Sequence, residues 1–134
     1  MSHSKKTEKM INQQEPTLLF AFKKSSHETV LVEALQKKAY RLLIAGTGEE
    51  TILVFSGNPK IDVIIIASDL PGKNTFETVS EIKQINASVP VILLSDFVTV
   101  NAVRLAIGIG CSEILQTPLS PGTLEEILLK YLNT

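Results

Sequence analysis

The stretch Ile61-Asp62-Val63-Ile64-Ile65-Ile66-Ala67-Ser68-Asp69-Leu70-Pro71-Gly72 decides the fold of this chain. Its β-branched run, residues 63–66, stops at small and polar residues that lead into a Pro-Gly turn. A continuous apolar run bounded by turn residues predicts a strand that is buried on both faces, at the centre of a parallel sheet. Ligands of open α/β sheets bind beyond the carboxyl ends of such strands, so chemistry is expected at Ala67, Ser68 and Asp69.

The overall composition is that of a globular domain. With 134 residues, of which 44% are hydrophobic and 20% charged, the chain is long enough for one domain with its own core. The formal net charge of -1 gives no electrostatic attraction to nucleic acid or to an anionic membrane. The single cysteine, Cys111, excludes an internal disulfide framework and a multi-cysteine metal site. We therefore expect a cytoplasmic protein that does not bind nucleic acid directly.

The apolar segments and the N-terminus indicate neither membrane insertion nor secretion. The longest apolar runs, near residues 61–67, are too short to cross a bilayer. The N-terminal lysines are not followed by the apolar segment of a secretory signal. Residues 1–15 are polar and predict a flexible tail, and residues 16–134 predict one domain.

Strand-like and helix-like segments alternate five times along this domain. Near-continuous apolar runs predict strands, and apolar residues at helical spacing predict helices. The predicted strands are residues 17–22, 40–45, 63–66, 89–94 and 113–116. The predicted helices run from about 25 to 39, from the turn at 46–50 to a break at 56–59, from 75 to 86, from 99 to 109, and from 121 onward. One apolar stripe is predicted on the third helix, at Phe76, Val79, Ile82 and Ile85.

Polar residues ahead of two helices predict N-terminal caps. Ser25 and Glu28 have the spacing of a capping box, and so do Thr47 and Glu50. The turn at 46–50 lacks the third glycine of a dinucleotide-binding loop, and no Gly-Lys-Ser/Thr follows, so it is predicted as a turn and a cap.

The alternation predicts an α/β fold in which helices cover both faces of a parallel sheet. The ends of the first, third, fourth and fifth strands should then face one crevice. These ends are Phe22-Lys23-Lys24, Ala67-Ser68-Asp69, Ser95-Asp96 and Thr117-Pro118.

From about Thr17 to Leu132 the chain resembles the receiver domain of two-component response regulators, the CheY-like family. The matching features are Tyr40, Gly48-Glu49-Glu50, Asp62, Leu70-Pro71-Gly72, Val89-Pro90-Val91-Ile92 and the proline after the fifth strand. The resemblance implies a flavodoxin-like, five-stranded parallel sheet in the order 2-1-3-4-5, with helices on both faces.

The resemblance also implies a reaction centre that this sequence does not keep. In the family, an acidic pair after the first strand helps to hold Mg²⁺, and a central aspartate accepts the phosphoryl group. A Ser or Thr after the fourth strand and a Lys before the last proline contact that group, and together with the cation they neutralise its charge. The matching positions here are Phe22 and Lys23, Ala67, Ser95 and Thr117, and the family's aromatic switch position is Ile114.

Only Ser95 keeps its role. Ala67 has no nucleophilic oxygen, and Lys23 places a positive charge where a divalent cation would bind. We therefore expect a degenerate receiver with no catalytic residues, no phosphoacceptor, and absent or weak Mg²⁺ binding. It would not be an enzyme, and it would act in phosphorelay signalling as a phosphorylation-independent protein-interaction and regulatory module.

Two carboxylates leave alternatives open. Asp69 and Asp96 are interpreted as loop residues at the crevice rim. Either could instead be a displaced phosphoacceptor, or could pair with Lys23 as a built-in cation that replaces the metal. A small α/β ligand-binding protein is a further alternative. His27 is interpreted as a surface or capping residue, and Cys111 as a packed one.

The resemblance also implies where partners bind. Receiver-like domains use the face of the fourth helix, fifth strand and fifth helix for dimers or for output contacts. In this chain that face would include exposed residues among 99–104, Glu113 and residues 125–130. We expect a protein partner, or a second copy of the chain, on this face.

Overall fold

The computed structural model describes residues 15–24, 26–58 and 60–132. The predicted flexible tail falls outside these ranges except for Glu15, which is exposed. The predicted N-cap Ser25 also lies outside the described residues.

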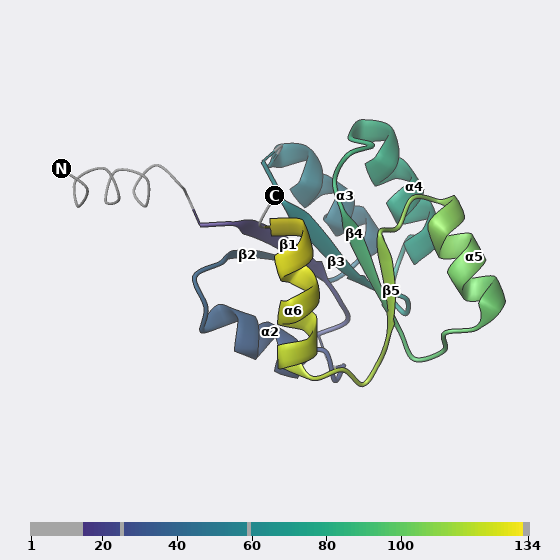
Figure 1. The fold of residues 1–134 in the computed structure, drawn as a ribbon. Coiled ribbons are helices and arrows are strands. Elements are labelled where there is room, and N and C mark those ends of the chain that lie inside the picture. Colours follow the sequence, from purple (N-terminus) through teal and green to yellow (C-terminus); the bar gives the residue numbers. More distant parts are fainter. Residues whose placement is uncertain (1–14, 25, 59, 133–134) are drawn as a thin grey trace.

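Strands and helices alternate through the described part of the chain, as the sequence predicts (Figure 1). They are β1 (Thr17–Ala21), α2 (Thr29–Gln36), β2 (Arg41–Ala45), α3 (Gly48–Gly57), β3 (Val63–Ala67), α4 (Thr75–Ile85), β4 (Val91–Ser95), α5 (Val100–Gly108), β5 (Glu113–Gln116) and α6 (Pro121–Leu132). The strands form one parallel sheet in the order β2-β1-β3-β4-β5. The predicted flavodoxin-like topology is confirmed.

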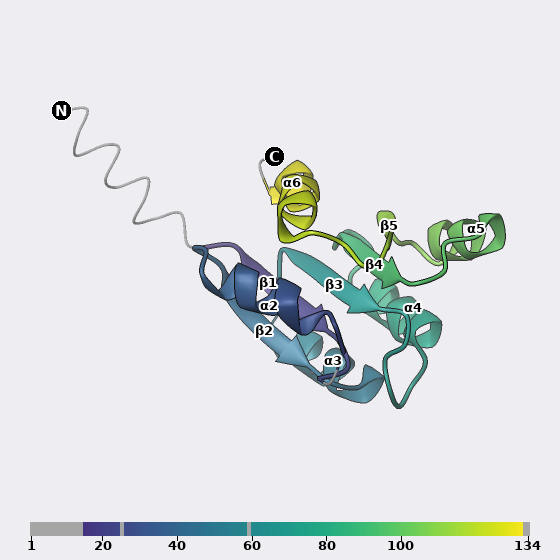
Figure 2. The same ribbon diagram turned by 90° about the horizontal axis from the view of Figure 1, so that it is seen from below.

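Helices cover both faces of the sheet. Figure 2 shows α2 and α6 on one face, with α3, α4 and α5 on the other. Two separate apolar cores result, one around Leu31, Leu35 and Leu124, and the other around Phe55 and Ile82. Within the described ranges, none of the helices combines the length and the apolar character that crossing a membrane requires.

The strand β3 is the centre of the sheet, and all five of its residues are buried. Its side chains alternate between the two cores because successive residues of a strand point to opposite faces. Ile64 and Ile66 pack with α3, α4 and α5, whereas Val63 and Ile65 pack with α2 and α6. Burial on both faces explains why the run contains no polar residue.

The first helix differs from the prediction. It begins at Thr29, and its N-cap is Glu28, whose side chain makes no capping hydrogen bond. The chain turns first, because Ser26 donates its N–H to the carbonyl of Lys23 at 2.9 Å. The predicted capping role of Glu28 is therefore wrong. The helix ends at Gln36 rather than Ala39, where the following residues are exposed and gain no burial from continuing it.

Other boundaries shift by one or two residues, and one end of the predicted apolar stripe on α4 is exposed. Ile85 is 53% exposed, although Val79 and Ile82 are buried as predicted. The cap at Thr47 is confirmed, since its hydroxyl accepts the N–H of Glu50 at 3.0 Å. The carboxylate of Glu50 accepts from Gly46, one residue ahead of the cap, at 2.5 Å.

Candidate functional site

The sheet register brings the predicted site positions to one edge. Ala67 is level with Leu94, and Ser95 is level with Gln116, so the ends of β3, β4 and β5 lie side by side. The N–H of Thr117 donates to the carbonyl of Ser95 at 2.9 Å, which holds the last two strand ends together. The predicted site positions therefore meet at the carboxyl edge of the sheet, and we call this group of strand ends and loops the crevice.

Two positions at this edge are apolar and buried. Ala67 is 1% exposed and Phe22 is 4% exposed, and both belong to the core under α2 and α6. The Phe22 ring packs edge-on against Phe20, with ring centroids 5.2 Å apart. The carbonyl of Ala67 accepts the hydroxyl of Thr75 at 2.7 Å. Side-chain oxygens for a metal or a phosphoryl group are therefore missing from both positions.

Thr117 contacts a carboxylate. Its side chain is buried, and its hydroxyl donates a hydrogen bond to Oδ1 of Asp96. The same Oδ1 lies 3.6 Å from Nε2 of His27. Asp96 therefore faces partners from the end of β5 and from the segment before α2.

Glu28 and His27 belong to the crevice, although the sequence interpretation did not place them there. Nε2 of His27 lies 2.6 Å from Oε2 of Glu28, but the two groups are not aligned as a hydrogen bond. The Glu28 side chain is 4% exposed. Burial raises the pKa of Glu28, the charge of His27 opposes that rise, and Asp69 and Asp96 add to it. The only sequence signal was the polar run of residues 23–28, which is long for a direct strand-to-helix turn.

Ser95 is the one position that keeps the residue type of the receiver family, and its hydroxyl takes part in a local turn. Its hydroxyl donates to the carbonyl of Phe97 at 3.1 Å and accepts the N–H of the same residue at 3.2 Å. This closed turn ends β4 and leaves the Phe97 side chain 79% exposed.

Lys23 does not form the built-in cation pair that was one alternative. Its side chain is exposed, and within the described ranges no ion pair joins it to Asp69 or Asp96. Asp96 faces His27 instead. Asp69 is exposed at the rim and acts on Glu28 through its charge. Among the described residues, no group of three or more His, Cys, Asp or Glu side chains is arranged to hold a metal ion.

The predicted partner face presents apolar side chains to solvent. The helix α5 buries only Ala106, while large side chains on and beside it stand free. These are Phe97 (79% exposed), Val100 (69%), Leu105 (58%) and Ile107 (64%). On the adjoining β5, Glu113 accepts the Tyr131 hydroxyl at 2.5 Å and lies 3.6 Å from the Lys130 ammonium. The large exposed apolar side chains of this face therefore lie on and beside α5.

Comparison with known proteins agrees with this architecture. The sequence model of the response regulator receiver domain matches residues 24–129. The autoinducer 1 sensor kinase/phosphatase LuxN of Vibrio campbellii is 29% identical over 85 residues. That match covers 63% of this chain but only 10% of LuxN, and the LuxN of Vibrio harveyi gives the same figures.

Solved receiver structures share the fold at low identity. A CheY-like response regulator receiver domain protein from Methanospirillum hungatei has a TM-score of 0.79 at 16% identity, covering 89% of this chain and 94% of that one. The chemotaxis protein CheY4 of Vibrio cholerae has a TM-score of 0.79 at 21% identity, covering 88% and 99% of the two chains. Because the sequence model of the family matches most of this chain, the chain belongs to the response regulator receiver domain family.

Proposed function

We propose that this receiver domain of two-component signalling lacks a phosphoacceptor and works by protein contact, independently of phosphorylation. The observation that carries the proposal is Ala67 at the end of β3. It is 1% exposed, and its methyl group offers no oxygen to attack a phosphodonor. Such a domain is a signalling module rather than an enzyme.

The surrounding positions support the same conclusion. Phe22 supplies no oxygen ligand, and Lys23 adds a positive charge near the place of the cation. Mg²⁺ binds through hard oxygen ligands, so the family's cation does not fit these side chains and should bind weakly or not at all. Thr117 is neutral and is already bonded to Asp96, so it cannot replace the cationic side chain that steadies a phosphoryl group.

Contacts within the chain join the elements around the crevice. Glu28 contacts His27, and both residues precede α2. His27 lies near Asp96, which follows β4, and Asp96 accepts a hydrogen bond from Thr117, which follows β5. These contacts favour one arrangement of the crevice loops without phosphate. Control of the domain would then come from a partner rather than from phosphorylation.

The exposed face of α5 is the proposed contact surface for a protein partner or a second copy of the chain. Contiguous exposed apolar side chains on a soluble domain mark interaction sites. Phe97, Val100 and Ile107 supply that character. We place this activity in the cytoplasm, on the basis of the sequence composition.

The experiment is incubation with Mg²⁺ and acetyl phosphate, followed by intact-mass measurement under conditions that preserve acyl phosphates. We expect no mass increase of one phosphoryl group, while a phosphorylatable receiver treated in parallel gains it. An acid-labile adduct on this chain would overturn the proposal.

The alternative of a displaced acceptor is tested in the same experiment. Asp69 is the more available of the two carboxylates, because Asp96 already contacts Thr117 and His27. If an adduct formed and the Asp69→Asn variant lost it, Asp69 would be the acceptor. The Asp96→Asn variant provides the matched control.

A further inference from the structure

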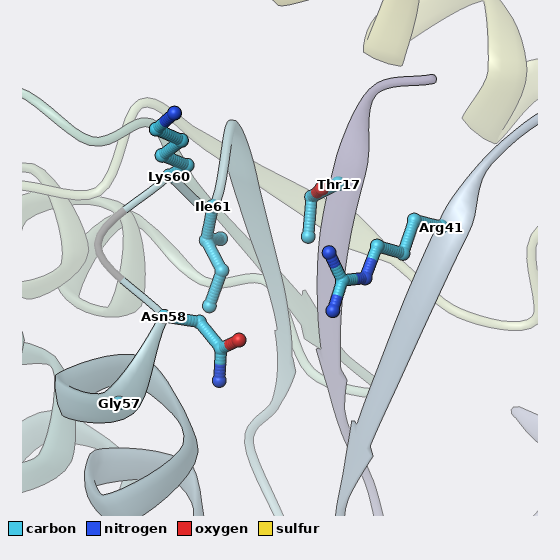
Figure 3. Close-up of a pocket in the computed structure, with 6 residues that line it drawn as sticks. All are labelled: Thr17, Arg41, Gly57, Asn58, Lys60 and Ile61. Atoms are coloured by element: carbon cyan, nitrogen blue, oxygen red, sulfur yellow. The ribbon is translucent and has the colours of Figure 1, made fainter. Parts of the chain in front are cut away.

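A pocket lies at the amino edge of the sheet, the edge opposite the crevice (Figure 3). Its volume is about 230 Å³. It opens where β1 and β2 begin and where α3 ends. The lining residues are Thr17, Arg41, Gly57, Asn58, Lys60 and Ile61.

The charged side chains of this pocket are both cationic. Arg41 and Lys60 are exposed, and within the described ranges neither lies in an ion pair with a carboxylate. The neighbouring carboxylate of Asp62 accepts the backbone N–H of Thr17 at 2.8 Å. Figure 3 shows the Arg41 guanidinium directed across the opening toward Asn58, while the Lys60 side chain extends away from the opening. Among the described residues, the two charged side chains that line the opening are therefore both positive, and the nearest negative charge is the Asp62 carboxylate beside Thr17.

The hydrogen-bonding groups define where an anion would lie. Asn58 uses its amide N–H₂ to donate to the carbonyl of Val54 at 2.8 Å, so its free side-chain atom facing the pocket is an acceptor. The carboxyl end of α3, at Gly57, also repels an anion because a helix ends in partial negative charge. An anion would therefore bind against the Arg41 guanidinium, away from Gly57 and from the Asp62 carboxylate.

We propose that this pocket is a binding site for a small oxyanion, a carboxylate or a phosphate, held by the Arg41 guanidinium. A guanidinium presents a planar pair of N–H donors that matches two oxygens of either group, and a lysine adds charge without that geometry. Lys60 adds positive charge nearby, but its side chain extends away from the opening. The site is separate from the crevice and does not depend on the proposed loss of phosphorylation.

The experiment follows backbone amide signals by NMR while the full chain is titrated with inorganic phosphate or with acetate, at constant ionic strength kept with NaCl. We expect saturable shifts at Thr17, Arg41 and Ile61 with a dissociation constant of roughly 1 mM, the scale of a site with one or two charged contacts. Saturation by either anion supports the site, and the tighter of the two identifies its ligand class.

Variants separate a built site from general charge attraction. Arg41→Gln should weaken binding about tenfold or more. Arg41→Lys should weaken it as well, because lysine lacks the planar pair of N–H donors of the guanidinium. Lys24→Gln removes the same charge from an exposed residue at the other edge of the sheet and should leave binding unchanged. The proposal is overturned if neither anion gives saturable shifts, or if Arg41→Gln binds as the parent does while its spectrum shows an intact fold.

Discussion

The hydroxyl of Thr117 donates a hydrogen bond to the carboxylate of Asp96, across 21 positions of sequence. Thr117 follows β5 and is 6% exposed, while Asp96 follows β4 and also faces His27. The bond joins two loops that, in a phosphorylated receiver, would both approach the phosphoryl group. In this chain the two loops contact each other.

A double-mutant cycle measures this contact. Thr117→Val and Asp96→Ala should each lower the free energy of unfolding by about 1.5 kcal/mol, the lower end of the range for a hydrogen bond to a charged group. The double variant should lose clearly less than the sum, because the second substitution finds the bond already broken. Urea unfolding of the four proteins gives the coupling energy. Additive losses would show that the two side chains act independently.

The free energy of unfolding should depend less on pH in the Glu28→Gln variant than in the parent protein. Burial raises the pKa of Glu28 above its ordinary value of 4.5, so the folded state holds this proton more tightly than the unfolded chain does. The stability that the protonated group contributes is present below that ordinary value, and it is lost as the pH rises through the folded-state pKa.

At neutral pH the Glu28→Gln variant should therefore be at least as stable as the parent, because it does not carry the buried charge. Urea unfolding between about pH 4 and 7, the range that spans a raised carboxyl pKa, measures the difference. Glu33→Gln, on the exposed side of α2, is the matched control and should follow the parent curve. A Glu28→Gln variant that is less stable at every pH would indicate that the carboxylate stabilises the crevice.

Charge placed on the exposed face of α5 should impair binding without impairing folding. Val100→Glu and Ile107→Glu alter side chains that are 69% and 64% exposed, so the free energy of unfolding should change by only about 0.5 kcal/mol. Sedimentation velocity should detect the loss of any self-association, and affinity capture with the cognate partner should detect the loss of partner binding. Gln84→Glu, which adds the same charge on the exposed surface of α4, should retain both. Unchanged association in both α5 variants would place the interaction elsewhere.

The thiol of Cys111 should resist alkylation in the native protein. Burial raises its pKa to about 11, and the nearby charge of Lys83 offsets only part of that rise. Thiolate, the reactive form, is therefore scarce at pH 8, and the side chain is 7% exposed. Iodoacetamide labelling followed by mass spectrometry should be slow in buffer and fast in urea. Rapid labelling of the folded protein would show that this site opens readily.

The features predicted from the sequence depend on local patterns. A strand that is buried on both faces must be apolar along its whole length, and β3 is. Helical spacing, turn residues and the order of segments then lead to a parallel sheet and to the receiver family. The alanine at position 67 could be recognised in the same way, because its place at a strand end follows from the run before it.

The crevice contacts depend on packing between distant segments. The sequence indicated a capping role for Glu28, but the turn that precedes Thr29 directs its carboxylate into the crevice instead. The bond between Asp96 and Thr117 requires the parallel register of β4 and β5, which places their ends side by side. Periodicity identifies an apolar face on α5 but not whether another element covers it, and the assembled fold leaves Val100 and Ile107 exposed. Strand order and family therefore follow from local residue patterns, whereas the contacts and the open surface are decided by which segments the folded sheet brings together.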